Sequence, residues 1–384
     1  MKVKDLGYVA LGSIFIGIML WEKMIRSHLF GVSGDDFDAV VGSAAQYKPY
    51  HLRGAHRPNT WKLALISDLD KDSRLPGKKP KFYSLFKRGQ LSRDGATGAF
   101  SASWREDVKL KSGHNEAGRG MELSELQWYN GKLLAMDDRT GIVYQIDRVD
   151  GDGSSKKTAP VAFPLHILME GNGAADKGQK TEWATVKDGK LYVGSYGKEY
   201  TDVIDGVYTV VKSTNRWVSV IDRRGHVEHR NWVANYAAVR TAGNGAFPGY
   251  QVQEAILWSA VHRKWFVLPR RSSPLKYDEK TDENMGANML IIADEHFKTT
   301  SMQHVGKLLP THGFSSAKFL PGSNDEVIVA LKSEEKETKG VEGGAKYQNI
   351  MRTFLTVFNW KTGQTLMEET EIPGAAKFEG LEFI

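Results

Sequence analysis

The chain has 384 residues, a net charge of +6, 39 Gly, and ten Trp, fourteen Tyr and sixteen Phe. A chain of this length can bury a large core, and abundant aromatic residues and glycines favour strands joined by turns. The absence of cysteine excludes disulfides and thiolate metal sites, and the Lys and Arg residues are dispersed, which argues against nucleic acid as a partner.

The first predicted element is an uncharged apolar run from Leu6 to Trp21, with Lys2 and Lys4 before it. As a helix it would span about 24 Å, which is short for an average bilayer and fits the thinner membranes of the early secretory pathway. We expect residues 1–5 to be a cytosolic tail, 6–22 a transmembrane signal anchor and 23–57 a polar stem. The small residues Gly31 and Ser33 lie too far from the run to favour the alternative, a cleaved signal peptide.

From residue 58 onward, five similar units each contain an apolar strand, a tight turn and a second strand that ends in charge. They read MELSELQWYNGKLLAMDDRTG, TEWATVKDGKLYVGSYGKE, VQEAILWSAVHRKWFVLPRRS, GFSSAKFLPGSNDEVIVALKSEE, and a split unit in which the C-terminal FEGLEFI joins LALISDLDKDSR. Such repeats indicate blades of a propeller, with room for long loops. We therefore predict an all-β, five-bladed β-propeller over 58–384, closed by pairing of its N- and C-terminal strands so that no sheet edge stays open.

The connections within these units carry turn signals. Asn130-Gly131 and Asp188-Gly189 lie between paired strands and predict type I′ hairpins. The charged, glycine-containing stretch Lys332–Gln348 is interpreted as a solvated loop.

The first strands of the five units place one oxygen-bearing side chain at an equivalent position: Ser124, Glu182, Glu254, Ser315 and Glu379. The intervals range from 58 residues (182 − 124) to 72 residues (254 − 182). Buried carboxylates are costly unless they are compensated, and Ca²⁺ accepts six to eight oxygen ligands. Because the set holds neither His nor Cys, it predicts a central Ca²⁺ in preference to a softer metal. The alternative is a set of polar residues around a water-filled channel.

The second strands end in carboxylates and cations, and equivalent strand ends of a propeller emerge on one face. The candidates at this mouth are Asp68, Asp137, Asp138, Arg139, Arg270 and Arg271. Carboxylates can bind metal and activate water, whereas arginines neutralise phosphoryl oxygens. The combination predicts hydrolysis of a metal-bridged polyphosphate. Asp68 or Asp137 would act on the water, and the arginines would stabilise the developing charge.

Two other classes of protein stay open at this point. A non-enzymatic propeller could bind sugars or partner proteins at the same mouth. A five-bladed glycosidase would need two carboxylates about 5–9.5 Å apart, and the neighbouring arginines argue against it because a neutral glycan needs no such charge. No P-loop, H-E-x-x-H or G-x-S-x-G motif is present, which removes the common ATPase, zincin and α/β-hydrolase chemistries.

Distinctive runs give the chain a resemblance to the calcium-activated nucleotidase (apyrase) family, in particular its membrane-anchored members. These runs, in order, are SDLD, GRGMELSEL, MDDRTGIVYQI, EWATVKDGKLYVG, YGKE, NWVANY, FVLPRRSS, GANMLI, HVGKLLPTHGFSSAKF, VALKSEE and FEGLEFI. The resemblance covers nearly everything from Asn59 to Ile384 and implies a five-bladed propeller with a central calcium. It assigns the calcium ligands to the same five positions, from Ser124 to Glu379.

The resemblance also implies hydrolysis of nucleoside di- and triphosphates, with UDP and GDP preferred. We accordingly expect a type II protein of the endoplasmic reticulum or Golgi membrane that supports lumenal glycosylation. A secreted form and a homodimer are further options. The lack of cysteine is a departure from the family, and it touches none of the matched site residues.

Overall fold

The computed structural model describes residues 59–150, 157–338 and 348–384. The chain divides into two units, 1–54 and 55–384. The predicted tail, signal anchor and stem lie outside the described residues, so these three predictions stay untested. Within the described part, no helix combines the length and the apolar character needed to cross a membrane.

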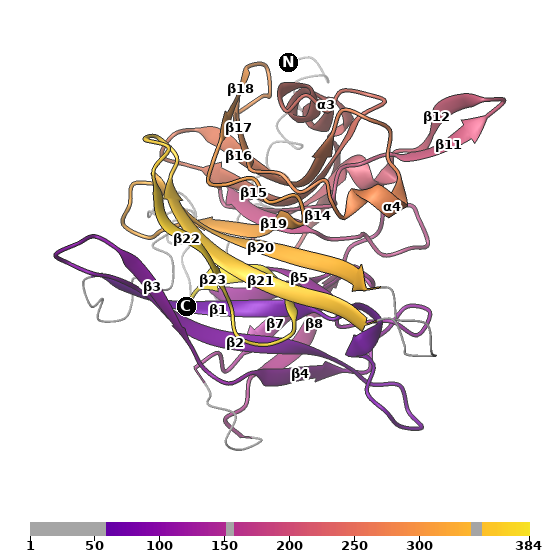
Figure 1. Ribbon diagram of the computed structural model, residues 1–384. Helices are drawn as coiled ribbons and strands as arrows, with labels where there is room; N and C mark the ends of the chain where they lie inside the picture. Colours follow the sequence, from indigo (N-terminus) through magenta and orange to yellow (C-terminus); the bar gives the residue numbers. More distant parts are fainter. Residues whose placement is uncertain (1–58, 151–156, 339–347) are drawn as a thin grey trace, which may run out of the picture. The chain divides into compact units, whose positions relative to one another are not determined.

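Apart from one separate hairpin, the described strands of the second unit form five sheets, which are the blades of the predicted propeller (Figure 1). Blade 1 contains β23 (Lys377–Phe383), β1 (Thr60–Asp68), β2 (Phe82–Arg93) and β3 (Phe100–Trp104), and β4 (Val108–Ser112) also pairs with β2. Blade 2 contains β5 (Leu123–Tyr129), β6 (Lys132–Asp137), β7 (Ile142–Asp147) and β8 (Val161–Ile167). Blade 3 contains β9 (Trp183–Lys187), β10 (Lys190–Gly194), β13 (Trp217–Ile221) and β14 (Val227–Asn231).

The last two blades follow the same pattern of consecutive antiparallel strands. Blade 4 contains β15 (Tyr250–Ser259), β16 (Lys264–Ser273), β17 (Met289–Asp294) and β18 (Thr300–His304). Blade 5 contains β19 (His312–Phe319), β20 (Val327–Thr338), β21 (Gln348–Asn359) and β22 (Thr365–Glu371).

The two ends of the described chain close the ring in blade 1. β23 pairs with β1 in antiparallel register, with Leu63 opposite Phe383 and Leu65 opposite Leu381. In Figure 1 the C-terminus accordingly lies at the end of β23, next to β1. The predicted closure by the terminal strands is therefore confirmed.

The inner strands β5, β9, β15, β19 and β23 contact one another in that cyclic order, so the first strand of every blade faces the centre. Hydrophobic clusters fill the spaces between adjacent blades. Leu126 and Ile66 belong to the cluster between blades 1 and 2, and Trp183 and Trp265 to the one between blades 3 and 4. Burial at each blade interface holds the inner strands in place, because no blade can cover both of its own faces.

The predicted hairpins have the backbone that their residues favour. Asn130 and Gly131 both have positive φ, 49° and 77°, and Asp188 and Gly189 repeat the pattern at 49° and 73°. Two consecutive positive φ angles are required by the type I′ turn, which matches the twist of the flanking strands.

Three further elements lie outside the blades. The hairpin of β11 (Tyr200–Ile204) and β12 (Val207–Lys212) forms a sheet of its own and extends away from blade 3 (Figure 1). Helix α3 (Val233–Ala242) connects blades 3 and 4 and contacts β17 and β18. The short elements are α4 (Glu279–Asp282) and the 3₁₀ turns η2 (Asp70–Ser73) and η3 (Thr214–Arg216).

The interpretation of Lys332–Gln348 as a loop is wrong for its first seven residues and for its last, Gln348, which begins β21. β20 continues to Thr338, and each residue from Lys332 to Thr338 pairs with β21. The charges in this stretch are consistent with a strand because the buried ones are paired. Lys332, for example, is 1% exposed and lies 2.6 Å from Glu369.

Candidate functional site

Four of the five predicted ring residues share a structural position in their inner strands, and the fifth lies just before its strand. Four of them are bulge residues, skipped by the ladder that joins the inner strand to the second strand of its blade: Ser124, Glu254, Ser315 and Glu379. The fifth, Glu182, immediately precedes β9 and donates its backbone N–H to the Gly194 carbonyl at 2.8 Å. A bulge turns one residue out of the regular alternation of a strand. The repeated bulge therefore explains how four of the inner strands present an extra oxygen side chain, whereas Glu182 lies just before β9.

All five ring residues are buried, with exposed fractions between 0% for Ser315 and 6% for Glu254. The Ser124 hydroxyl has no hydrogen-bond partner among the described residues. Arg270, near the end of β16 in blade 4, forms ion pairs with two of the ring carboxylates. Its Nη1 lies 2.5 Å from Glu254 Oε2 and 2.6 Å from Glu379 Oε1.

A second layer of charge comes from the residues two positions before three of the ring residues. Glu122 precedes Ser124, Lys180 precedes Glu182 and Lys377 precedes Glu379. Lys180 Nζ lies 2.6 Å from Glu182 Oε1 and also contacts Asp138. Sequence reasoning missed this layer, although a charged residue recurs two positions before the ring residue in three of the five units, which is the signal that could have found it.

Lys377 is the centre of the larger charge network. Its Nζ lies 2.8 Å from Asp68, 2.9 Å from Asp70 and 2.8 Å from Glu335. Glu335 also lies 3.1 Å from Arg270 Nη2, so it links the two cations. The sequence analysis missed Glu335 because it lies in the part of β20 that was interpreted as a loop.

Asp68, Glu122 and Asp138 form a compact group of buried carboxylates whose candidate ligand atoms all lie within 4.8 Å of one another. Each has a cation beside it, because Lys377 contacts Asp68, Arg119 contacts Glu122 and Lys180 contacts Asp138. Asp138 Oδ1 alone is buried without a hydrogen-bond partner among the residues described here. The structure thus brings together two of the predicted acids, Asp68 and Asp138, and adds Glu122.

Asp137 has a different environment from Asp138. Its Oδ1 accepts the backbone N–H groups of Arg139 and Thr140, both at 3.0 Å, and its Oδ2 accepts that of Met121 at 2.9 Å. Burial raises the pKa of Asp137 to about 7. With three backbone donors on its two oxygens, this carboxylate holds the turn after β6 and is poorly placed to act on water.

The three predicted arginines, Arg139, Arg270 and Arg271, also have different surroundings. Arg139 lies at the edge of the network, with Nη2 3.8 Å from Glu116. Arg271 is 3% exposed, and its Nε lies 4.0 Å from Asp282 Oδ2. Because Arg270 and Arg271 are consecutive in β16, they point to opposite faces of the blade, and the structure brings only Arg270 to the ring carboxylates.

The central network carries an excess of negative charge. Eight carboxylates (Asp68, Asp70, Glu122, Asp138, Glu182, Glu254, Glu335 and Glu379) face four cations (Arg119, Lys180, Arg270 and Lys377). If all are ionised, four negative charges are uncompensated. Such an excess of buried carboxylates suits a hard dication such as Ca²⁺.

The titration behaviour of the acids reflects the same excess. Burial raises the pKa of Glu254 to about 7, and the nearby Glu182 carboxylate adds to this although Arg270 opposes it. Burial also raises the pKa values of Glu379 and Asp138. A dication at the centre would favour the ionised carboxylates, so metal binding and proton release are coupled here.

Fold and site together define a five-bladed propeller with an acidic, calcium-type centre beneath a mixed charged mouth. Residues 69–384 match the family model Apyrase, and the chain belongs to the apyrase family. It is 41% identical over 325 residues to soluble calcium-activated nucleotidase 1 of Rattus norvegicus, covering 84% of this chain and 74% of the relative. It is 40% identical to apyrase apy-1 of Caenorhabditis elegans, covering 84% of each chain.

A third relative extends over more of the chain. Apyrase of Cimex lectularius is 38% identical over 382 residues, covering 97% of this chain and 95% of that protein. Among solved structures, a DUF4221 family member from Bacteroides vulgatus covers 83% of this chain at 8% identity with a TM-score of 0.32, a likeness too distant to support an argument. Membership of the apyrase family favours the nucleotidase prediction over the binding-module and glycosidase alternatives.

Proposed function

We propose that this protein is a Ca²⁺-dependent hydrolase of nucleoside diphosphates and some triphosphates, with UDP and GDP as preferred substrates. The observation that carries the proposal is a set of five buried oxygen side chains, one on or just before each inner strand, beside a charge network in which acids outnumber cations by eight to four. The relatives described as calcium-activated nucleotidases and apyrases support it.

Ser124, Glu182, Glu254, Ser315 and Glu379 would hold the calcium ion, which would supply positive charge beside the phosphates. Asp68, Glu122 and Asp138 lie on the mouth side of the ring. The same four cations that now pair with carboxylates, above all Arg270 and Lys377, are available to bind phosphoryl oxygens once the added dication satisfies those acids. Calcium and nucleotide would then replace pairings that these carboxylates and cations make with one another.

Asp138 is the best-placed candidate for the base. The Oδ1 of Asp138 is buried and has no hydrogen-bond partner among the described residues. By contrast, both carboxylate oxygens of Asp137 accept backbone N–H groups. Burial raises the pKa of Asp138 above its ordinary value, which brings a carboxylate closer to the range where general bases work. Asp68, held by Lys377 and the Asp70 backbone, would orient the same water.

The chemistry is then a displacement at the terminal phosphorus. The water oxygen forms a bond to phosphorus, its proton passes to Asp138, and the bond to the bridging oxygen breaks to release inorganic phosphate. Charge spreads over the equatorial and leaving oxygens in a loose transition state. Arg270, Lys377 and the more peripheral Arg139 are the groups that stabilise it.

Location and assembly are part of the proposal. A signal anchor at residues 6–22 would place the propeller in the lumen of the endoplasmic reticulum or Golgi apparatus, where removal of UDP and GDP supports glycosylation. The support is the apolar run and the basic residues before it. A homodimer and a secreted form are compatible with this assignment, and size measurement and cell fractionation test them.

The decisive experiment is phosphate release from UDP by the full chain at controlled calcium concentrations. We expect activity that requires calcium and that falls by about 100-fold or more in Asp138→Asn. Asp176→Asn, an exposed change with no partner in the network, should leave the rate unaltered. Hydrolysis that persists after calcium is removed would rule out the mechanism.

A further inference from the structure

Two of the five proposed calcium ligands are serines, and the protein holds them differently from the three carboxylates. All three carboxylates form ion pairs with a lysine or an arginine. The Ser124 hydroxyl has no hydrogen-bond partner among the described residues, and the Ser315 hydroxyl makes a long hydrogen bond, at 3.4 Å, to the Phe378 carbonyl. The positions of these two hydroxyls therefore depend on how the backbones of β5 and β19 are fixed.

The residues that follow the two serines contact each other. Glu125 comes directly after Ser124, and Ser316 comes directly after Ser315. Ser316 Oγ donates a hydrogen bond to Glu125 Oε1 at 3.0 Å. Glu125 is 2% exposed and Ser316 is 0% exposed, so this link between blades 2 and 5 is shielded from water.

The Ser316 hydroxyl also contacts the strand between these two blades. β23 lies between β19 and β5 around the centre, and the Leu381 backbone N–H of β23 donates to Ser316 Oγ at 3.2 Å. The buried Lys318 of β19 lies 3.4 Å from Glu125 Oε1 and donates to Gln127 of β5 at 3.2 Å. One buried polar cluster thus joins three of the five inner strands, β5, β19 and β23.

The Glu125–Ser316 link lies where the two bulges end. In β5 the pairing with β6 resumes at Glu125, opposite Met136, and in β19 the pairing with β20 resumes at Ser316, opposite Leu331. The bulge residue itself is left unpaired, so the nearest paired residues determine where it points. Because these two paired residues are bonded to each other, the bond restricts the distance between the serines that precede them.

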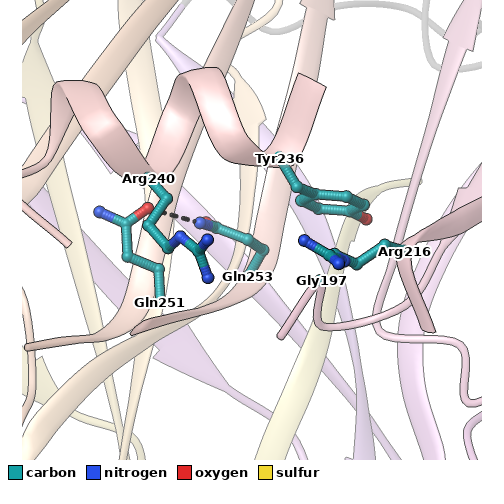
Figure 2. A pocket seen from close by; sticks show the side chains of 6 residues that line it. All are labelled: Gly197, Arg216, Tyr236, Arg240, Gln251 and Gln253. Atoms are coloured by element: carbon teal, nitrogen blue, oxygen red, sulfur yellow. Dashed lines mark hydrogen bonds between the residues drawn. The ribbon is translucent and has the colours of Figure 1, made fainter. Parts of the chain in front are cut away.

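The ring residue Glu254 is fixed in a different way, through the residue before it. The Gln253 backbone N–H donates to the Tyr196 carbonyl at 2.9 Å. The Gln253 side chain donates to Gln251 of the same strand at 2.9 Å (Figure 2). A glutamate can also adjust its reach by rotating about several bonds, whereas a serine hydroxyl has one such bond. The two serine ligands therefore depend more on the backbone than Glu254 does.

We propose that the Glu125–Ser316 link fixes the spacing of the two serine ligands and so determines which divalent cation the ring prefers. The inference rests on the calcium site proposed above. Ca²⁺ binds oxygen at about 2.3–2.6 Å and Mg²⁺ at about 2.0–2.1 Å, and selectivity between such ions follows from the size and flexibility of the ligand set. Sr²⁺ is larger than Ca²⁺, so a ring of fixed spacing disfavours both of the other ions. Glu125 and Ser316 act through the serines before them and are positioning residues.

The test measures the dissociation constants of Ca²⁺, Mg²⁺ and Sr²⁺ for the full chain by titration calorimetry, without nucleotide. We expect the unmodified protein to prefer Ca²⁺ over each of the other ions by about 10-fold or more. In Ser316→Ala the preference over Sr²⁺ should fall to within about threefold of one, because a loosened ring adapts to the larger ion. A loss of stability alone would weaken the binding of all three ions and leave their ratios unchanged.

Ser259→Ala is the matched control. Ser259 is also fully buried, and its hydroxyl donates to Asp325 at 2.8 Å and accepts the His262 backbone N–H at 3.0 Å. It therefore makes the same kinds of hydrogen bond between blades 4 and 5, but it lies at the end of β15, five residues beyond Glu254 (259 − 254). This variant should keep the ion preferences of the unmodified protein.

Three outcomes would overturn the assignment. The first is an unmodified protein that binds Sr²⁺ as tightly as Ca²⁺, which needs no variant and does not depend on folding. The second is a folded Ser316→Ala protein that keeps the original preferences, and the third is an equal loss of preference in Ser259→Ala. Glu182→Gln separates this failure from that of the proposed function. If it binds calcium as tightly as the unmodified protein, the ring is not the calcium site, whereas weaker binding leaves the ring standing even if the link is refuted.

Discussion

The raised pKa of Glu254 predicts that neutralising this ring carboxylate stabilises the protein when calcium is removed. Its pKa is about 7 in the folded chain against an ordinary value of 4.5. The folded state therefore binds the proton more tightly than the unfolded state does. Between about pH 4.5 and 7 stability of the calcium-free protein falls as pH rises, since the unfolded state releases its proton first.

The size of the effect follows from the shift. A difference of about 2.5 units corresponds to about 3 kcal/mol once the pH is above the folded pKa. Glu254→Gln is neutral at every pH, so it should raise the melting temperature of the calcium-free protein by about 5 °C at pH 7.5. At pH 5 the gain should nearly disappear. The same variant should lose most of the stabilisation that calcium gives the unmodified protein.

The assay is thermal unfolding of protein stripped on a chelating resin, with and without added calcium. Glu335→Gln is a matched control with the opposite sign. Burial would raise the pKa of Glu335, but Lys377 and Arg270 lower it well below the ordinary value. Its ionised form therefore stabilises the fold, and the variant should melt at a lower temperature at pH 7.5. If Glu254→Gln also melts lower without calcium, the excess of negative charge at the centre is not a source of instability and the reasoning fails.

Three other changes test separate parts of the site. Asp137→Asn should destabilise the fold by about 1–3 kcal/mol, since an amide nitrogen cannot accept the backbone N–H groups. Asp138→Asn should instead keep the melting temperature and lose turnover. Chemical denaturation and kcat measurements separate the two variants, and equal effects would contradict the roles assigned here. Arg270→Met should bind calcium more tightly, because the cation beside Glu254 and Glu379 is removed, yet it should hydrolyse UDP about 100-fold more slowly. Titration calorimetry measures the calcium affinity and steady-state kinetics measures the hydrolysis. Weaker calcium binding in this variant would contradict the prediction. Gly380→Ala would place a Cβ 2.7 Å from the Glu125 carbonyl carbon. Because the clash would displace the inner strand that carries Glu379, the variant should bind calcium more weakly and melt at a lower temperature. A variant with normal calcium affinity would show that the inner strands tolerate displacement.

Much of the fold could be predicted because its signals are local and repeated. The turns at Asn130-Gly131 and Asp188-Gly189 identify hairpins by their need for positive φ. The oxygen side chains at Ser124, Glu182, Glu254, Ser315 and Glu379 recur once in each unit, and a repeat fixes equivalent positions without any knowledge of the structure. The pairing of FEGLEFI with the strand before SDLD followed from the same alignment.

The features that the sequence analysis did not predict depend on contacts between residues that are distant in the sequence. Lys332 and Glu335 are charged residues in a charged segment, and only their partners Glu369 and Lys377 show that they belong to a buried strand. Asp137 and Asp138 are adjacent and identical, and only the backbone groups around them separate a turn residue from a candidate base. Sequence composition carries no information of that kind.

Because Glu379 belongs to β23, the last of the described strands, the ring stays incomplete until that strand has been synthesised. A nascent chain can form blades 2 to 4 as they emerge, but blade 1 waits for β23, and blade 5 lacks its neighbour until then. The five ring residues can therefore come together only after β23 has left the ribosome. Until that moment the faces of β1 and β19 that β23 covers are surfaces that a chaperone would have to shield.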